Sequence, residues 1–361
     1  MKKVYYYLIL IFSIIIVTLA AGELTIRGYL FFHKDRISTL MSDIFFSQYH
    51  LINYKIKSIN MYFLKKNFST VIYANGLVWH HETDKYGFRN RGHNAEKSDV
   101  LLIGDSFIYG HGVEINQTVT EYLRNNHGIY AYNMGRSSDC LYQSYVLLRT
   151  YYDLFKPKKV IIFPFFNDID DLLALRSEKQ LTDLPEITAY NYSEILDETL
   201  KNDGGIPEKA RMIRYKSYLY RLYKAKEIVF KSLLTSGGHK HEVDLRDLSI
   251  SVYSRPNYQL IEGYYLSILK DIKRLCSKYN TEVYLVNIYP QIEGRDLHLK
   301  KAIEDFDKFM QHVAMKSNIN YFDTKILFNN EPEYYIPIDK HLSDKGHKKL
   351  AAFIAQILEK H

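Results

Sequence analysis

Cysteine is scarce in this chain, which has only Cys140 and Cys276 among its 361 residues. One potential pair cannot form the disulfide framework that stabilises small secreted domains. Neither cysteine has the surroundings of a nucleophile, and none lies near the N-terminal apolar run, which excludes a lipoprotein anchor. The length, with 47% hydrophobic and 25% charged residues, instead indicates one large globular domain with appendages.

Several binding signatures are also missing from the sequence. We find no internal repeat and no glycine-rich loop of the phosphate-binding kind. The pairs His80-His81 and His239-Lys240-His241 lack carboxylates or cysteines at metal-site spacing, so we expect surface histidines. The net charge of +7 comes without a nucleic-acid-binding motif. We therefore expect no metal, no cofactor and no nucleic-acid partner.

A long apolar run from Val4 to Ala21 follows Met1-Lys2-Lys3. At about 1.5 Å per residue such a helix would be about 27 Å long, close to the hydrocarbon thickness of a bilayer. Lysines before the run predict a cytoplasmic N-terminus, with the rest of the chain outside the cytoplasm. We interpret residues 1–22 as a transmembrane anchor. A cleavable signal peptide is the alternative, because Leu19-Ala20-Ala21 places small residues near the end of the run.

The most informative local pattern is an apolar strand, Val100–Ile103, that ends in Gly104-Asp105-Ser106. A strand that stops at a glycine and turns into a helix presents the next side chain at the carboxyl edge of the sheet, where α/β folds bind ligands. A serine at a helix start has unpaired N–H groups nearby that can hold an oxyanion. Ser106 is therefore a candidate nucleophile, although the tripeptide alone would equally fit a helix cap.

A base and an acid for this serine occur near the other end of the chain. Asp339-Lys340-His341 precedes a helical apolar pattern. A histidine can take the serine proton, and a carboxylate can orient the imidazole. Two further polar groups each follow an apolar strand, so all four elements could meet at one sheet edge. These groups are Asn133-Met134-Gly135 and Phe165-Phe166-Asn167-Asp168.

This ordered set of motifs resembles the SGNH, or GDSL-type, superfamily of esterases and acyltransferases, over roughly residues 86–361 apart from a long middle segment. The run Tyr86-Gly87-Phe88-Arg89 is similar to one subgroup, whose members often begin with a membrane anchor. The resemblance implies that Ser106 is the nucleophile, His341 the general base and Asp339 the third member of the triad. It also implies an oxyanion hole formed by the N–H groups of Ser106 and Gly135 and by the Asn167 side chain.

Two features depart from the pattern of this superfamily. Phe165 stands where the third motif usually has a glycine, and its bulk could narrow the acyl pocket or move the backbone. The last motif is Asp-x-His rather than the common Asp-x-x-His, and Ile338 cannot orient an imidazole. If Asp339 points away from the ring, the site is a Ser–His dyad in which a backbone carbonyl fixes His341.

From residue 98 onward, alternating strand and helix signals predict an α/β fold. We expect a flavodoxin-like three-layer sandwich with a mostly parallel five-stranded sheet. The expected strands are 99–103, 129–133, 160–164, 283–288 and 319–322. The gap of roughly 120 residues after the third strand exceeds an ordinary crossover and implies a helical insertion at about 172–258.

The insertion contains two expected helices. One is short and acidic, between Pro185 and Pro207; the other is basic, over 208–234, and could form a lid that faces a polyanion or a lipid. With the anchor, the chain divides into residues 1–22, a membrane-proximal region 23–97 and a catalytic domain 98–361.

Together these patterns predict an envelope-anchored serine esterase or O-acyltransferase that forms an acyl-enzyme on Ser106. The substrate would be an acylated, above all acetylated, glycan or lipid outside the cytoplasm of a bacterium. The motifs do not distinguish hydrolysis from transfer. The alternative is a catalytically inactive glycan-binding or envelope-assembly protein that retains the fold. Phe165 favours that alternative, whereas the intact Ser106, Asn167, Asp339 and His341 oppose it.

Overall fold

The structure is a computed structural model that describes residues 2–33, 52–56, 61–74, 76–91, 98–175, 192–201, 217, 220–221, 250–292 and 297–360. The chain divides into two compact units. The first comprises Met1–Tyr54, Val71–Val78 and Gly204–Glu242, and the second comprises Lys55–Thr70, Trp79–Asp203 and Val243–His361. Every candidate site residue belongs to the second unit.

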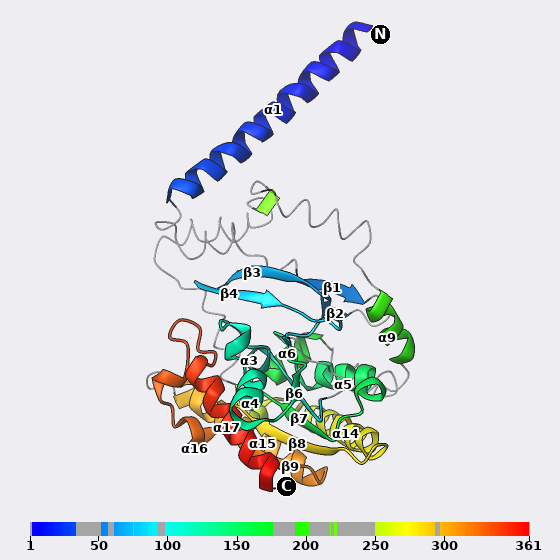
Figure 1. The fold of residues 1–361 in the computed structure, drawn as a ribbon, viewed down its shortest axis with the longest axis vertical. Helices are drawn as coiled ribbons and strands as arrows, with labels where there is room; N and C mark the ends of the chain where they lie inside the picture. The colour runs from blue at the N-terminus through cyan, green and yellow to red at the C-terminus, as the bar shows by residue number, and fades with distance from the viewer. Residues whose placement is uncertain are drawn as a thin grey trace. The chain divides into compact units, whose positions relative to one another are not determined.

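The second unit is built on a parallel sheet of five strands in the order β6-β5-β7-β8-β9 (Figure 1). The strands are β5 (Val100–Gly104), β6 (Ala131–Asn133), β7 (Lys159–Phe163), β8 (Glu282–Asn287) and β9 (Asn320–Asp323). They agree closely with the expected ranges. Because β6 and β7 lie on opposite sides of β5, the order of the strands reverses there, and the crevice beside β5 and β7 is where such folds bind ligands.

Helices cover both faces of this sheet, which confirms the expected three-layer α/β fold. On one face α4 (Val119–His127) packs against α17 (Asp344–Lys360). Leu102 and Ile161, which are partners in the register of β5 and β7, share a buried cluster with residues of both helices. The helices α5 (Leu141–Phe155), α14 (Tyr258–Ser277) and α15 (Leu297–Lys316) pack against one another in series. All five residues of β5 are buried, as expected for a parallel sheet covered on both sides.

Shorter elements complete the described chain. The helices are α3 (Ser106–Tyr109), η4 (Ile115–Gln117), α6 (Asp168–Leu175), α9 (Tyr192–Lys201), η5 (Val252–Ser254), α16 (Lys325–Phe328) and η6 (Pro332–Tyr334). Two small sheets pair β1 (Asn53–Ile56) with β2 (Met61–Leu64), and β3 (Ser69–Ala74) with β4 (Leu77–Glu82). The short acidic helix expected in the insertion is α9. The basic helix expected over 208–234, apart from 217 and 220–221, and the histidines at 239 and 241 lie outside the described residues.

The first unit contains one long apolar helix, α1 (Lys2–His33). Its segment Tyr5–Tyr29 has 25 residues with a mean hydropathy of 2.4, and none of it is buried. This exceeds the about 20 residues needed to cross a bilayer. The helix continues past the boundary expected at residue 22. In this continuation, Glu23 and Arg27 form an ion pair at 2.7 Å. A single such helix near an N-terminus fits a membrane anchor and a signal sequence equally well.

Both cysteines are buried free thiols, so they do not form a disulfide. Cys140 directly precedes α5 and Cys276 lies in α14. Burial raises the pKa of the Cys276 thiol to about 12, which keeps it protonated and unreactive at neutral pH.

The fully buried side chain of Arg89, in the segment before the sheet, forms hydrogen bonds to the turn after α3. Its guanidinium donates to the carbonyl oxygens of His80 at 2.8 Å and Val113 at 2.6 Å. It also donates to the carbonyl oxygens of Tyr109 and Gly110. The planar guanidinium carries several donors in a fixed geometry, so one side chain donates to several carbonyl groups of this irregular turn, of which Gly110 also accepts the Val113 N–H at 3.4 Å.

We expect Arg89→Met to lower the free energy of unfolding by about 3 kcal/mol, because it leaves several buried carbonyl oxygens without donors. The measurement is chemical unfolding of the full chain followed by circular dichroism. Arg149→Met is the matched control, since Arg149 lies on the exposed side of α5 and should change stability by no more than about 0.5 kcal/mol. Equal effects of the two substitutions would contradict this account of Arg89.

Candidate active site

Ser106 is the first residue of α3, directly beyond the carboxyl end of β5. Asp105 caps the helix, and its carboxylate accepts the N–H of Phe107 at 2.9 Å. The capping role therefore belongs to Asp105, and the Ser106 hydroxyl is left for another partner. A Cβ at Gly104 would lie 2.9 Å from Ile108 Cγ1 and 3.0 Å from Phe163 Cβ. Glycine at this position lets the helix turn tightly against β5 and β7.

The structure brings Ser106 and His341 together. His341 Nε2 lies 2.7 Å from Ser106 Oγ, within hydrogen-bond distance. A tight turn presents the histidine: the Ile336 N–H donates to the His341 carbonyl at 2.7 Å, and the Lys340 N–H donates to the Ile336 carbonyl at 2.9 Å. The His341 side chain is 18% exposed, so the ring is largely shielded yet accessible from one side.

Asp339 lies beside the same imidazole. Its Oδ2 is 3.1 Å from His341 Nδ1, and its Oδ1 accepts the His341 backbone N–H at 3.2 Å. The carboxylate thus faces the ring, as in a triad, instead of pointing away as in a dyad. Ile338, the neighbour that cannot orient an imidazole, is 65% exposed.

Two of the three expected oxyanion donors, Gly135 and Asn167, form hydrogen bonds to other groups in this structure. Gly135 lies against α3, where a Cβ would be 2.3 Å from Tyr109 N, but its N–H donates to Asn133 Oδ1 at 2.8 Å. The Asn167 amide donates to Asp171 Oδ2 at 3.0 Å. One Asn167 N–H remains, since a primary amide carries two. The N–H of Ser106, at the first position of α3, has no acceptor within the helix.

Hydrogen bonds of Asn90 and Asn133 fix the loop after β6 relative to α3. Asn90 pairs with the backbone of Asn133, donating to its carbonyl at 2.9 Å and accepting its N–H at 2.8 Å. The Asn133 side chain in turn donates to the Ile108 carbonyl in α3 at 2.8 Å. Because Asn133 Oδ1 also accepts the Gly135 N–H, one side chain fixes the distance between the loop after β6 and the nucleophile helix.

Phe165 forms an apolar wall near the base. It is 8% exposed, and its ring centroid lies 4.3 Å from that of Phe107 and 4.8 Å from that of Phe166. The Phe107 ring lies 4.9 Å from the His341 ring. The bulky residue at the usual glycine position therefore packs among aromatic rings beside the nucleophile helix.

One residue beside the candidate triad was not identified from the sequence. His111, just after α3, places its Nε2 3.3 Å from Asp339 Oδ2, and its ring is 4.4 Å from the His341 ring. His111, Asp339 and His341 each offer a ligand atom, and these atoms lie within 4.8 Å of one another, so the three could hold a cation. Spacing along the sequence could not reveal this group, because His111 is far from the other two in the chain.

The expectation of a surface histidine at position 81 is wrong. His81 is fully buried, and its Nδ1 lies 2.7 Å from the Tyr109 hydroxyl. The cause is the alternation along β4, which directs Trp79 and His81 inward and leaves His80 exposed. Burial, together with the charge of Arg89, lowers the pKa of His81 to about 3, so this ring is neutral.

Several carboxyl groups are buried around the loops that follow β5, β6 and β7. Burial raises the pKa of Asp105 to about 7 and that of Asp139 to about 6, the latter against the opposing effect of Arg136. Burial and Asp170 raise the pKa of Asp171 to about 6. Burial, Asp105 and Asp171 raise the pKa of Asp168 well above its usual value. Asp168, Asp170 and Asp171 lie in the first turn of α6.

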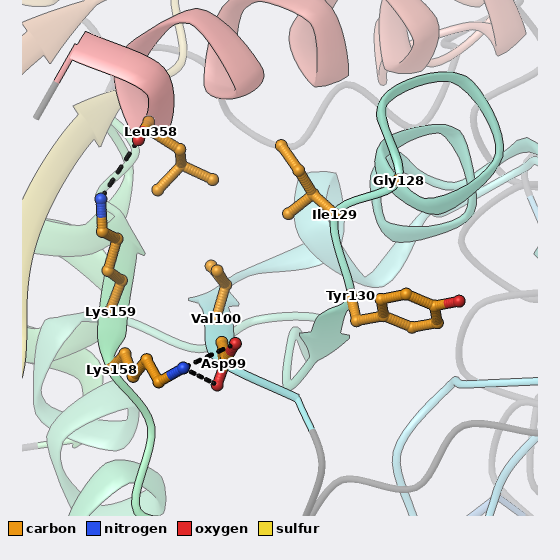
Figure 2. A pocket seen from close by; sticks show the side chains of 8 residues that line it. All are labelled: Asp99, Val100, Gly128, Ile129, Tyr130, Lys158, Lys159 and Leu358. Atoms are coloured by element: carbon orange, nitrogen blue, oxygen red, sulfur yellow. Dashed lines mark hydrogen bonds and ion pairs between the residues drawn. The ribbon is translucent and has the colours of Figure 1, made fainter.

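A pocket of about 340 Å³ lies at the opposite edge of the sheet (Figure 2). Asp99 and Lys158, 3.1 Å apart, line it near the starts of β5 and β7. Lys159 points to the end of α17, where it donates to the Leu358 carbonyl at 3.2 Å. None of the candidate site residues lines this pocket, so we assign it no role in the chemistry of Ser106.

No family model matches the chain, and no curated protein matches it either. Among solved structures it is similar to the acetylxylan esterase Axe2 of Geobacillus stearothermophilus, at 14% identity and a TM-score of 0.38 over 72% of this chain and 93% of that one. It is also similar to a lipase/acylhydrolase of Enterococcus faecalis, at 13% identity and a TM-score of 0.38 over 73% and 96%.

A GDSL-like lipase of Bacteroides thetaiotaomicron is a third similar structure, at 16% identity and a TM-score of 0.35 over 73% of this chain and 89% of that one. At these values we draw neither activity nor substrate from the matches. The function proposed below rests on the side chains around Ser106.

We expect Asp168→Asn to stabilise the protein more at pH 8 than at pH 5. A carboxyl whose pKa is higher in the folded than in the unfolded state keeps its proton on folding, so stability falls as the pH rises through that range. The asparagine cannot ionise, so its advantage grows with pH. Chemical unfolding of both proteins at the two pH values gives the difference in their free energies of unfolding. The buried neutral histidines are the same in both proteins, so their contribution cancels in this difference. An advantage that shrinks with pH would contradict the assignment.

Proposed function

We propose that this protein is a serine esterase or O-acyltransferase that forms an acyl-enzyme on Ser106. The observation that carries the proposal is the 2.7 Å contact between His341 Nε2 and Ser106 Oγ, with Asp339 Oδ2 3.1 Å from the other ring nitrogen. A serine hydroxyl is a weak nucleophile by itself, and an oriented histidine is the group that activates it.

In the proposed first step, His341 Nε2 takes the Ser106 proton as Oγ bonds to the ester carbonyl carbon. The imidazolium is stabilised by Asp339. Burial alone would raise the pKa of this carboxyl, but the two neighbouring histidines hold the pKa well below its usual value. When the tetrahedral intermediate collapses, the bond to the leaving alcohol breaks and His341 returns the proton to that alcohol. Water or a second alcohol then attacks the acyl-enzyme by the same route.

The negative oxygen of the intermediate would be held by the Ser106 N–H and by the Asn167 amide proton that Asp171 does not accept. The Gly135 N–H would join them by exchanging its bond to Asn133 Oδ1 for one to the oxyanion. Removing a single such donor costs on the order of 10²–10³ in turnover in other enzymes, so the exchange at Gly135 would matter for the rate.

For the substrate we propose an ester of a short acyl group, above all acetyl, on a glycan or lipid outside the cytoplasm. Phe165 supports a short acyl group, because its ring fills space against Phe107 beside the base. The extracytoplasmic side is supported by Lys2 and Lys3, which precede an apolar helix long enough to span a bilayer.

An inactive glycan-binding or envelope-assembly protein is the second candidate. It is favoured by the hydrogen bonds that occupy the Gly135 N–H and one Asn167 amide proton, since a site with fewer oxyanion donors would bind an ester more readily than cleave it. The aligned Ser106, His341 and Asp339 weigh against it, because binding alone does not require them.

The nucleophile can be tested by intact-mass analysis of the full chain in detergent after treatment with a fluorophosphonate. We expect one label on the wild type, none on Ser106→Ala, and labelling slowed on the order of 10³-fold or more in His341→Ala. Ser137→Ala is the matched control: this serine follows the motif after β6 and has no described base, so its replacement should leave labelling intact. A folded wild type that takes no label would favour the inactive candidate.

The topology can be tested with a reporter that is active only outside the cytoplasm, fused after His361. We expect an active reporter and a fusion that stays in the membrane fraction after an alkaline wash, because α1 anchors the chain with its lysines in the cytoplasm. A soluble product that begins near residue 22 would show that the helix is a cleaved signal peptide. An inactive reporter would reverse the proposed orientation.

A further inference from the structure

We propose that His111 is a positioning residue of this site, which holds the Asp339 carboxylate with its Nε2–H and supports the His341 ring with its own ring. The proposal rests on the function proposed above, since it assigns the group that keeps acid and base aligned for Ser106.

The geometry places one carboxylate oxygen between two imidazoles. Asp339 Oδ2 lies 3.1 Å from His341 Nδ1 and 3.3 Å from His111 Nε2. The His111 and His341 rings are stacked, with centroids 4.4 Å apart and planes at 26°. The His111 ring also packs against Trp79, with ring centroids 4.6 Å apart. The side chains of His111 and Asp339 are only 8% and 5% exposed, so water competes little with these contacts.

His111 is fixed relative to the nucleophile through the backbone. Its N–H donates to the Ser106 carbonyl at 3.0 Å, in a turn where Gly110 has φ +83°. Arg89 holds the carbonyls of Tyr109 and Gly110 in the same turn. The residue that braces Asp339 is therefore built into the C-terminal end of the short helix that Ser106 begins.

Asp339 needs such a brace because of its place in the chain. In the Asp-x-His arrangement the acid lies two residues before the base, on the same turn. Its other carboxylate oxygen, Oδ1, accepts the His341 backbone N–H at 3.2 Å, from within that same turn. A neutral imidazole has one N–H group. If the proton of His111 is on Nε2, this N–H donates to Asp339 Oδ2 and keeps that oxygen facing His341. Outer groups of this kind commonly orient the ligands or acids that they contact.

Burial and the neighbouring positive groups favour the neutral form of His111. Burial is the largest cause of the lowered pKa of His111, and His341 and Arg89 lower it further, whereas Asp339 opposes them. Around the neighbouring His341 lie the buried Asp105 and His347, in addition to Asp339. A neutral His111 can donate to Asp339 throughout the neutral pH range without placing a second positive charge beside the imidazolium of His341.

The test compares two substitutions of His111. His111→Phe keeps an aromatic ring in contact with Trp79 and His341 but removes the donor to Asp339. His111→Gln keeps an N–H close to the position of Nε2 but removes the ring. His81→Phe is the control, because it removes another buried imidazole with a hydrogen bond, to Tyr109, that touches neither Asp339 nor His341.

The readouts are kcat and KM on an acetyl ester, or the rate of fluorophosphonate labelling, from pH 5 to pH 9. We expect His111→Phe to lower kcat on the order of 10-fold to 100-fold with little change in KM. We also expect its acid limb to move up by about 0.5 pH unit or more, because the full carboxylate charge then favours the protonated base. His111→Gln should keep the acid limb close to that of the wild type, and His81→Phe should not move it.

An activity-independent readout is the low-field proton resonance of the His341 Nδ1–H in full chains carrying Ser106→Ala. It should shift in His111→Phe and stay near its original position in His111→Gln. If the wild type is labelled at Ser106 but His111→Phe leaves kcat, the acid limb and this resonance unchanged, the proposal for His111 is wrong. If Ser106 is never labelled but the resonance shifts as expected, the brace exists and the proposed function fails instead.

Discussion

The candidate site depends on one buried cation, the guanidinium of Arg89. It contributes no group to the proposed chemistry, yet it donates to the carbonyl oxygens of Tyr109 and Gly110 at the end of the nucleophile helix, and to Val113 beyond it. The helix α3 is a single turn, too short to be stable alone. Its C-terminal carbonyls therefore need a donor from elsewhere in the chain, and the segment before the sheet supplies one. The orientation of Ser106 at one end of α3 and of His111 just past the other follows from this contact.

The fold was largely predictable because parallel strands are buried on both faces. Val100–Ile103, Val160–Phe163 and Val283–Val286 are short, almost uninterrupted apolar runs, a signal that depends on local sequence alone. The shortest strand, β6, was expected to begin earlier than it does, because the apolar Ile129 and Tyr130 precede it without pairing. Between Leu175 and Ile250 the sequence showed helical periodicity, and most of this stretch lies outside the described residues.

The site was predictable only in part, and the reason is again physical. Ser106, His341 and Asp339 lie in short motifs that were recognised by their order along the chain, and the structure brings them together. His111 has no such pattern, because its importance arises from a contact with a loop at the far end of the chain. The burial of His81 was not predicted, because it depends on the inward and outward alternation of side chains along the short strand β4. The partners of Gly135 and Asn167 were not predictable, because they depend on rotamers of Asn133 and Asp171 that tertiary packing selects.

The contact between Ser106 and His341 joins residues 235 positions apart in the chain. A ribosome adds residues in order, and the N-terminal part of a domain can begin to fold first. The nucleophile strand, its helix and the buried Arg89 can therefore form while the base has not yet been synthesised. Until α17 and the turn before it dock, the Ser106 hydroxyl has no proton acceptor, so a nascent chain would carry an inert serine.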